Sequence, residues 1–205
     1  MLTLKDKNLL LIFARNAVLG KVKTRLAKSV GDETALKIYE FLLQKTHQVT
    51  QEVSCIKAVH YSEKIMADDI WEVGDYQKHL QQGDDLGQRM RHAFKNSFER
   101  GYKKVVVIGT DLFDLTPELI EESFLSLNSN DVVLGPAKDG GYYLLGMKTL
   151  HTPLFNNKAW GSSSVKEDTL KDLIHKKVHL LKELNDIDVF EDIRHHPAFT
   201  KFLPS

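Results

Sequence analysis

The sequence predicts a single α/β domain over residues 1–205, with a mostly parallel central sheet and helices on both faces. Three observations support this fold class. Residues 104–108 are rich in β-branched side chains, which is typical of a strand buried in the middle of a parallel sheet. Strand-like and helix-like segments alternate through the first two-thirds of the chain. No repeat, low-complexity tract or linker rich in proline and serine interrupts the sequence.

The first half of the chain contains the expected strands at residues 9–13, 55–61 and 76–80. A helix is predicted from Gly31-Asp32, because the apolar residues that follow recur at helical spacing. Residues 62–71 are expected to form a short helix. A further helix follows the polar loop at residues 82–90 and ends at Gly101, a residue that commonly terminates helices.

The second half contains the strand at residues 104–108, followed by a helix that begins at Thr116-Pro117. Two more strands are expected at residues 131–134 and 142–145. The connection between them is too short for a crossover helix, so the strand at 142–145 should be antiparallel or lie at an edge.

The C-terminal part has two capping-box patterns and a short strand. Ser164 with Glu167 predicts the start of one helix, and Asp188 with Glu191 predicts the start of the last. A strand is expected at residues 178–181.

The composition limits the classes of partner. Lys and Arg number 28, and Asp and Glu also number 28, so the formal net charge is zero. This balance argues against a nucleic-acid partner, and any anion site must be a local cluster. The single Cys55 excludes an intrachain disulfide, and its apolar setting indicates a core residue in a reducing compartment. The apolar run at residues 9–13 is too short for a signal peptide or a membrane span, so we expect a cytoplasmic protein.

A basic loop follows the first strand. Residues 14–26 carry Arg15, Lys21, Lys23 and Arg25 around Gly20. Arg offers bidentate contacts to phosphate oxygens and Lys offers a point charge, so the loop is a candidate phosphate cradle. The alternative is a solvated basic turn. The loop is not a P-loop, because it lacks a second glycine at the required distance.

Carboxylates and glycines mark two further loops. Asp111 lies just past the predicted central strand, where open α/β sheets bind ligands. Asp139 precedes Gly140 and Gly141, which either allow close approach of a ligand or simply form a tight turn. Asp84 and Asp85 begin a helix, and their favourable interaction with the helix dipole alone could explain them.

Several motifs together resemble a known family. They are the basic loop with its preceding Phe13, residues 83–90, residues 109–116, residues 135–143, residues 160–162 and residues 186–188. The family is the bacterial GT-A-like glycosyltransferases associated with arsenosugar biosynthesis, long classed as a domain of unknown function. It is similar in fold to the molybdenum-cofactor and phospholactate guanylyltransferases, and the resemblance covers about residues 9–193.

The resemblance implies a GT-A fold and transfer from a nucleotide diphosphate with the help of Mg²⁺ or Mn²⁺, which suit all-oxygen ligation. Asp111 would be the principal metal ligand, Asp188 the second, with Asp186 behind it. Asp139 would bind a sugar hydroxyl or act as the base. The other implied contacts are Arg15, Lys23 and Arg25 to phosphates; Asp84, Leu86 and Gly87 to base or ribose; and Gly140, Gly141 and Trp160 to sugar or acceptor.

Three functions follow from these expectations. The first is a metal-dependent glycosyltransferase that moves a sugar from a nucleotide-sugar to a small acceptor. The second is a nucleotidyltransferase that uses a nucleoside triphosphate and releases pyrophosphate. The third is a non-catalytic nucleotide-binding module, motivated by the departure from the family pattern at Leu112 and Phe113. Ala17 and Leu19 also depart from that pattern, because the family usually has prolines in this loop, which should make the loop less rigid. The sequence sets neither the acceptor nor the oligomeric state.

Overall fold

A seven-stranded sheet forms the centre of the molecule. The computed structural model describes residues 8–203, and the strands lie in the order β3-β2-β1-β4-β6-β5-β7. Every neighbouring pair is parallel except those that involve β6, which runs antiparallel to both β4 and β5. The strands are β1 (Asn8–Ala14), β2 (Ile56–Tyr61), β3 (Tyr76–Leu80), β4 (Lys104–Ile108), β5 (Val132–Pro136), β6 (Tyr142–Met147) and β7 (Val178–Leu180).

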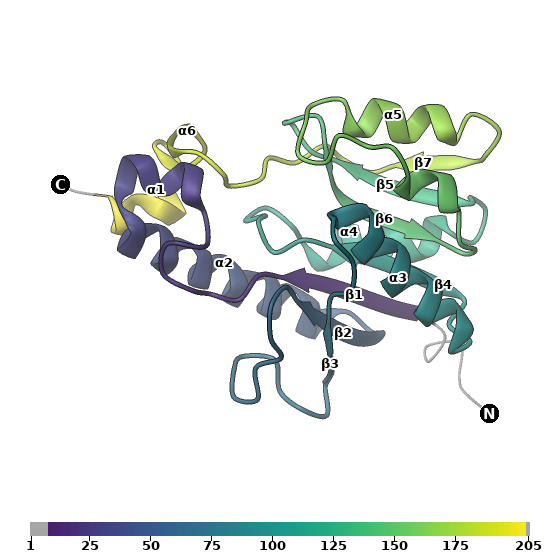
Figure 1. Ribbon diagram of the computed structural model, residues 1–205, viewed down its shortest axis with the longest axis horizontal. Coiled ribbons are helices and arrows are strands. Elements are labelled where there is room, and N and C mark those ends of the chain that lie inside the picture. Colours follow the sequence, from purple (N-terminus) through teal and green to yellow (C-terminus); the bar gives the residue numbers. More distant parts are fainter. Residues whose placement is uncertain (1–7, 204–205) are drawn as a thin grey trace.

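Helices flank this sheet, and one group of helices extends past its end (Figure 1). No helix of the described residues is both long and apolar enough to cross a membrane. The helices are α1 (Thr24–Val30), α2 (Asp32–Glu52), α3 (Leu86–Glu99), α4 (Pro117–Ser126), η2 (Thr152–Phe155), α5 (Val165–Asp172), α6 (Phe190–Ile193) and η3 (Pro197–Phe202).

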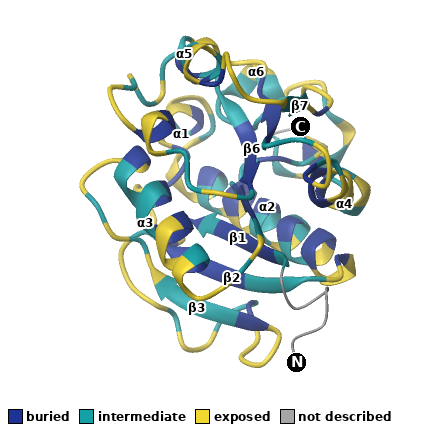
Figure 2. Ribbon diagram, turned by 90° about the vertical axis from the view of Figure 1, so that its right-hand side faces the viewer, coloured by how far each residue is buried: buried dark blue, intermediate teal, exposed yellow. Residues whose placement is uncertain are grey.

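The side chains of the strands alternate between two cores, one on each face of the sheet. In Figure 2 the strands are coloured mainly as buried or intermediate, and exposed residues lie mainly in loops and helices. On one face, Leu10 and Ile12 of β1 pack with residues of α2 and α4. On the other face, Leu9 and Leu11 pack with Phe94 of α3 and with η2. All of these β1 side chains are buried, so β1 lies inside the sheet with helices covering both faces.

A third cluster lies beyond the end of the sheet. Leu26 of α1 and Ile38 and Leu42 of α2 pack against Ile193 and Phe199 from the end of the chain. The chain reaches this cluster through residues 181–189, a segment we call the strap, which runs from β7 back to α6 (Figure 1). The strap therefore joins the last strand to the helices that follow the first strand.

Most expected elements are confirmed, with shifts of a residue or two at their ends. The strand at 142–145 is antiparallel, as predicted, and lies between β4 and β5 rather than at an edge. Cys55 packs against the first core, and burial raises the pKa of its thiol to about 12, which confirms its structural interpretation.

One predicted element is absent, and neither predicted capping box forms as expected. Residues 62–71 form bends and irregular backbone instead of a helix, because side chains hold the backbone there: Asn16 contacts residues 63 and 64, and Asp69 accepts from the Trp71 amide. Ser164 precedes α5 without a side-chain cap. For α6 the N-cap is Val189 rather than Asp188, and Asp192 accepts from the amides of both.

Candidate functional site

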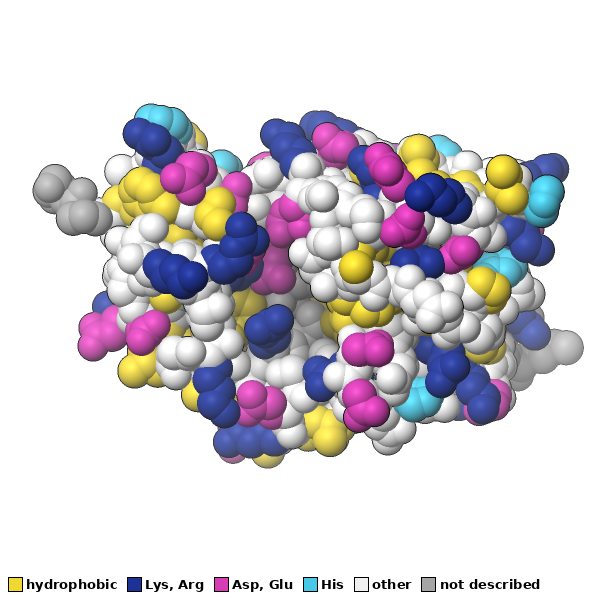
Figure 3. Space-filling view, turned by 45° about the horizontal axis from the view of Figure 1, so that its top comes forward, with side chains coloured by type: hydrophobic (Ala, Val, Ile, Leu, Met, Phe, Trp, Pro, Cys, Tyr) yellow, Lys and Arg dark blue, Asp and Glu magenta, His cyan; other side chains and the backbone are white. Residues whose placement is uncertain are grey.

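A cleft of about 620 Å³ opens at the carboxyl ends of β1 and β4. Its walls come from the loop after β1, the start of α3, the turn between β5 and β6, residues 160–165 and the strap residue Asp186. Figure 3 shows a hollow across the middle of one face, with basic and acidic side chains around it. The cleft therefore occupies the position where open α/β sheets bind ligands.

The basic loop after β1 contributes only part of its charge to the cleft. Arg15 and Lys21 line it. Lys23 is almost fully buried and forms an ion pair with Asp111. Arg25 is exposed, pairs with Asp188 and lies outside the lining. Among the described residues Arg15 has no ion-pair partner, whereas Lys21 contacts Glu63 at 3.3 Å on the surface.

Three carboxylates also line the cleft. Asp111 follows β4, Asp139 lies in the turn before β6, and Asp186 comes from the strap. Burial raises the pKa of Asp186 to about 6, and the negative charges of Asp139 and Asp111 contribute to the same rise. The strap thus brings Asp186, rather than Asp188, to face the predicted Asp111.

The strap is attached to the loop after β4 by backbone contacts. The Ile187 amide donates to the Asp111 carbonyl at 2.9 Å, and Leu112 forms an isolated bridge with Asp186. Ala137 pairs in the same way with Leu184. These contacts bring carboxylates from three separate segments of the chain into the same cleft.

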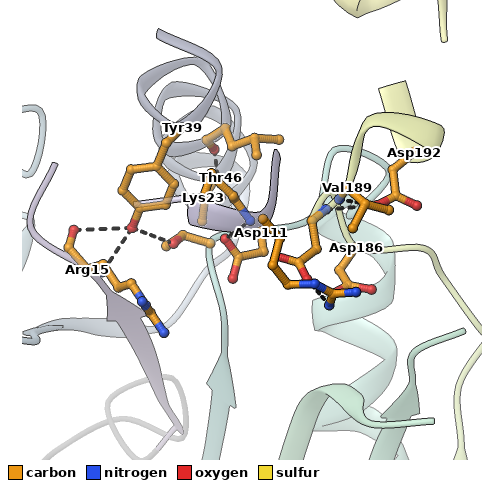
Figure 4. Close-up of polar contacts among 12 residues, drawn as sticks. Arg15, Lys23, Tyr39, Thr46, Asp111, Asp186, Val189 and Asp192 are labelled. Carbon is orange, nitrogen blue, oxygen red and sulfur yellow. Dashed lines mark hydrogen bonds and ion pairs between the residues drawn. The ribbon is translucent and has the colours of Figure 1, made fainter. Parts of the chain in front are cut away.

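The Tyr39 hydroxyl connects the basic loop to the end of β4 (Figure 4). It accepts from the Arg15 amide at 2.9 Å, and it lies 3.1 Å from both the Arg15 carbonyl and the Thr110 hydroxyl. Burial raises the pKa of this phenol above its usual value, so the hydroxyl keeps its proton. Tyr39 therefore fixes the backbone of Arg15 beside the residue that precedes Asp111.

The turn after β2 is attached to the same loop through Asn16. Its side-chain oxygen accepts from the Glu63 amide at 2.9 Å, and its nitrogen donates to the Lys64 carbonyl at 2.8 Å. Ser62 donates to the same oxygen, and Gln81 contacts the carbonyls of Ala14 and residue 60. This part of the cleft wall is thus held by amide side chains.

The start of α3 places its predicted residues in different environments. Asp84 and Leu86 line the cleft. Asp85 caps α3, because its carboxylate accepts from the Gln88 amide at 2.8 Å. Gly87 is buried under Trp160, and a Cβ there would lie 2.6 Å from the indole nitrogen.

The turn before β6 contains the two predicted glycines. Gly141 lines the cleft, and its amide donates to the Asp139 carboxylate at 2.8 Å. At Gly140 the closest neighbour is the backbone of Ser163, because a Cβ would lie 2.2 Å from that carbonyl oxygen. Gly140 therefore holds residues 160–164 against the turn, where Trp160 packs edge-on to Tyr142 and lines the cleft.

The carboxylates suit a divalent cation in part. No three His, Cys, Asp or Glu side chains within residues 8–203 are arranged to enclose a metal ion. Mg²⁺, however, is commonly held by one or two carboxylates with substrate phosphates completing its shell. Asp111 and Asp186 supply such oxygens. Burial is the main cause of the raised pKa of Asp186, and a cation would relieve the smaller contribution that comes from the negative charges of Asp139 and Asp111.

Some site residues were missed from the sequence. Tyr39 belongs to the apolar face of the helix that begins at Asp32, and the only sign of its role in the sequence is that a hydroxyl on a buried face needs a hydrogen-bond partner. Asn16 and Thr110 lie within the motifs at residues 14–26 and 109–116, but their roles, like that of Ser62, arise from contacts between segments far apart in the sequence.

The pKa of Asp186 leads to a prediction about stability. The folded-state pKa lies above the ordinary value, so the unfolded chain loses its proton first as pH rises. The carboxylate therefore lowers the stability of the metal-free protein increasingly between about pH 4 and pH 6. We expect Asp186→Asn to stabilise it by about 1 kcal/mol at pH 7.5, after allowance for solvent screening, and by little at pH 4.

Melting curves of both proteins at the two pH values test this. Asp188→Asn is the control, because it removes an ion pair with Arg25 and should give no stabilisation. An equal effect of Asp186→Asn at both pH values would contradict the assignment.

The contact at Gly140 leads to a second prediction. Gly140 and Gly161 have similar positive φ angles, 89° and 85°, but only Gly140 has neighbours within 4 Å of an added Cβ. Gly161→Ala should cost about 1–2 kcal/mol through the backbone conformation alone. Gly140→Ala should cost about 1–3 kcal/mol more, since Ser163 must move. Urea unfolding of both variants measures the difference, and equal losses would exclude a tight packing contact.

Comparisons with known proteins were made for sequence and for structure. Curated proteins gave no significant sequence match. A proposed nucleotide-diphospho-sugar transferase from Desulfovibrio desulfuricans G20 shares 29% identity over 95% of this chain and 91% of its own, with a TM-score of 0.84.

Two further structures share the fold at low identity. One is the 4-diphosphocytidyl-2C-methyl-D-erythritol synthase from Anaerococcus prevotii DSM 20548, at 12% identity, 96% and 97% coverage and a TM-score of 0.63. The other is the inositol-1-phosphate CTP transferase from T. maritima, at 12% identity, 97% and 95% coverage and a TM-score of 0.57.

In sequence, the family profile described as "Uncharacterized protein conserved in bacteria (DUF2064)" matches residues 42–162. That match spans more than half of the chain, and the chain therefore belongs to the DUF2064 family.

Proposed function

We propose that the protein is a metal-dependent glycosyltransferase that takes a sugar from a nucleotide-diphospho-sugar to a small acceptor. The observation that carries the proposal is that basic and acidic side chains line the same cleft. Arg15, Lys21 and Arg89 line it together with Asp111, Asp139 and Asp186. A diphosphate needs cationic partners, and a divalent cation needs carboxylates, so the cleft offers both beside one another.

The similarity to the Desulfovibrio protein supports this proposal. It extends over nearly the whole of both chains, and that protein's name proposes a nucleotide-diphospho-sugar transferase. The more distant structures include enzymes whose names specify transfer of a cytidylyl group. All of these names describe transferases that use a nucleotide, which is the broader class to which we assign this chain.

The basic side chains would hold the diphosphate. Arg15 extends from a loop whose backbone is anchored to Tyr39, so its guanidinium starts from a fixed position. Asp111 and Asp186 would hold Mg²⁺ or Mn²⁺, which when bound neutralises the charge that develops on the departing diphosphate. Lys23 forms an ion pair with Asp111, so its buried ammonium helps to hold that carboxylate in position.

The remaining residues would arrange the two reacting groups. An acceptor hydroxyl oxygen forms a bond to the anomeric carbon of the sugar while the bond from that carbon to the diphosphate oxygen breaks. The proton of the acceptor hydroxyl passes to a carboxylate, for which we assign the exposed Asp139. Trp160 offers an apolar wall for the sugar, and residues 84–86 border the region for the base or ribose.

The small number of basic side chains in the cleft favours a diphosphate over a triphosphate. Of the four basic residues in the segment after β1, Lys23 and Arg25 are paired with Asp111 and Asp188. Arg15 and Lys21 remain in the lining, where Lys21 also contacts Glu63, and Arg89 of α3 is the other basic residue that lines the cleft. A nucleotidyltransferase that releases pyrophosphate remains the second candidate, because the distant structural neighbours include cytidylyltransferases.

The non-catalytic alternative loses its main support. Leu112 is buried in the first core and pairs with Asp186 in the strap. Phe113 packs against Phe41 and Phe199, so it anchors the third cluster. These two departures from the family pattern are therefore explained by packing, while the carboxylates beside them still face the cleft.

The first prediction concerns the cation. Nucleotide-diphospho-sugars and nucleoside diphosphates should raise the melting temperature with Mn²⁺ present, by a few degrees at about 100 times Kd. Asp111→Asn and Asp186→Asn should abolish the metal-dependent part of this shift. Each variant is compared with its own ligand-free melting curve, because Asp111→Asn also leaves the buried Lys23 without its partner.

Asp188→Asn is the matched control and should keep the metal-dependent response. A larger response to triphosphates than to diphosphates would favour nucleotidyl transfer. If no nucleotide stabilises the protein with either cation, the proposed function is wrong.

The second prediction concerns the phosphates. Arg15→Ala should weaken binding of a nucleoside diphosphate about tenfold or more, and binding of the nucleoside much less, because a charge-assisted contact is lost. Isothermal titration with both ligands measures the difference. Arg25→Ala, from the same loop but outside the lining, serves as control. Equal losses for diphosphate and nucleoside in Arg15→Ala would contradict a phosphate role.

A further inference from the structure

A second groove lies on the face of the sheet that carries α3. It has a volume of about 420 Å³ and is bordered by β1, β2, β3 and α3. Its floor consists of the buried side chains of Leu9, Leu11 and Ala58. Arg89 borders both this groove and the main cleft, and no other side chain is shared between them. The groove is thus a separate concavity with a polar wall.

Two histidines form part of that wall through the register of the strands. His60 of β2 pairs with Phe13 of β1 on one side and with His79 of β3 on the other. Their rings follow one another, with centroids 5.4 Å apart for Phe13 and His60 and 5.1 Å apart for His60 and His79. His60 is 9% exposed, and its ring has no hydrogen-bond partner among the described residues. The ring nitrogens of His60 are not among the enclosed polar atoms that lack a partner, so they are accessible from the groove that His60 lines and are open to a ligand there.

The charged groups around the groove are mainly basic. Burial lowers the pKa values of both histidines, and that of His60 falls to about 3. The positive charge of Arg100, which follows α3, contributes to both shifts. The titratable and charged side chains that face the groove are His60 from β2, His79 from β3, and Arg89, His92, Glu99 and Arg100 from α3. Only Glu99 among them is acidic. The wall therefore carries two arginines and three histidines but only one carboxylate.

The side chain of Gln77 provides a further unsatisfied group. Its nitrogen donates to the Tyr102 hydroxyl at 3.2 Å, and its buried oxygen has no partner. A half-turn of the amide would let the oxygen accept from the Tyr102 hydroxyl and turn the nitrogen, a donor, to the position of the oxygen. Gln77 lines the groove, so a ligand with acceptor oxygens would remove the unsatisfied contact.

We propose that this groove is a second ligand site, which binds the phosphate group of a small molecule through His60, His79 and Arg100. Imidazole N–H groups and a guanidinium are suited to phosphate oxygens. A metal site does not account for the groove, since the described residues contain no group of three metal-ligating side chains placed around a common point. The proposal is independent of the reaction in the main cleft.

The bound anion should favour the protonated form of His79. An opposite charge within hydrogen-bond distance raises the pKa of His79, so binding takes up a proton there and tightens as pH falls from 8 to 6. His60, whose pKa burial lowers to about 3, stays neutral in this range and contacts the anion through its ring N–H. Phosphate itself changes charge in this range, so the pH series is run with sulfate, whose charge stays constant. Affinity for sulfate that is independent of pH would contradict contact with the histidines.

The decisive experiment is an NMR titration of the histidine side chains with inorganic phosphate and, in parallel, glycerol 3-phosphate. We expect the pKa of His79 to rise by about one to two pH units at saturation. Tighter binding of glycerol 3-phosphate would identify a phosphate monoester as the ligand, and equal or tighter binding of inorganic phosphate would identify the free anion. If neither probe moves the His60 and His79 signals, the proposal is wrong.

Variants separate this groove from the main cleft and from general charge. Arg100→Gln should weaken phosphate binding, followed through the pKa of His79, about tenfold or more. Arg100 is exposed, so we expect the variant to fold normally. Lys103→Gln, an exposed cation nearby that does not line the groove, should leave the effect unchanged. Arg15→Ala should also leave it unchanged, because that residue belongs to the main cleft. Loss of the effect in Arg15→Ala but not in Arg100→Gln would overturn the proposal.

Discussion

The pairing of the strap with the loops after β4 and β5 is the constraint on which the site depends. Two isolated bridges hold residues 184–187 against those loops. Their backbone hydrogen bonds run from the Ile187 amide to the Asp111 carbonyl, from the Leu184 amide to the Pro136 carbonyl, and from the Lys138 amide to the Leu184 carbonyl. The buried side chains of Leu184 and Ile187 fix the same segment in two different cores. Without this attachment Asp186 would not reach Asp111, and the helices beyond the sheet would lose their connection to β7. The same contacts therefore stabilise the fold and bring the carboxylates into the cleft.

In the basic segment after β1, some positive charges are paired with carboxylates and others remain available to a ligand. Lys23 is buried against Asp111, and Arg25 pairs with Asp188 in the strap, so half of the basic loop serves to hold the loop in place. Tyr39 then fixes the backbone of Arg15 with its single hydroxyl. What remains available to a ligand is a small number of cations on a rigid support. Such preorganisation lowers the ordering cost of binding an anion.

Much of the fold could be predicted from local patterns. The β-branched run of β4 and the apolar spacing of α2 identify their structures because each depends on a period within one segment. The helix expected at residues 62–71 is absent because Asn16, far away in the sequence, satisfies that backbone. The strand β6 was correctly expected to be antiparallel from its short connection, whereas its central place required knowledge of its neighbours.

The sequence by itself determined the fold class, the family resemblance and the candidate loops, because hydrophobic periods and motif spacing are properties of neighbouring residues. The tertiary structure decided which charges face the cleft. Asp186 lines it and Asp188 does not, although only Ile187 separates them, because the strap turns one side chain to Asp111 and the other to Arg25. The tertiary structure also packs the backbone of Ser163 directly against Gly140, where a side chain would not fit. Such choices depend on contacts between segments distant in the chain, and local sequence carries no record of them.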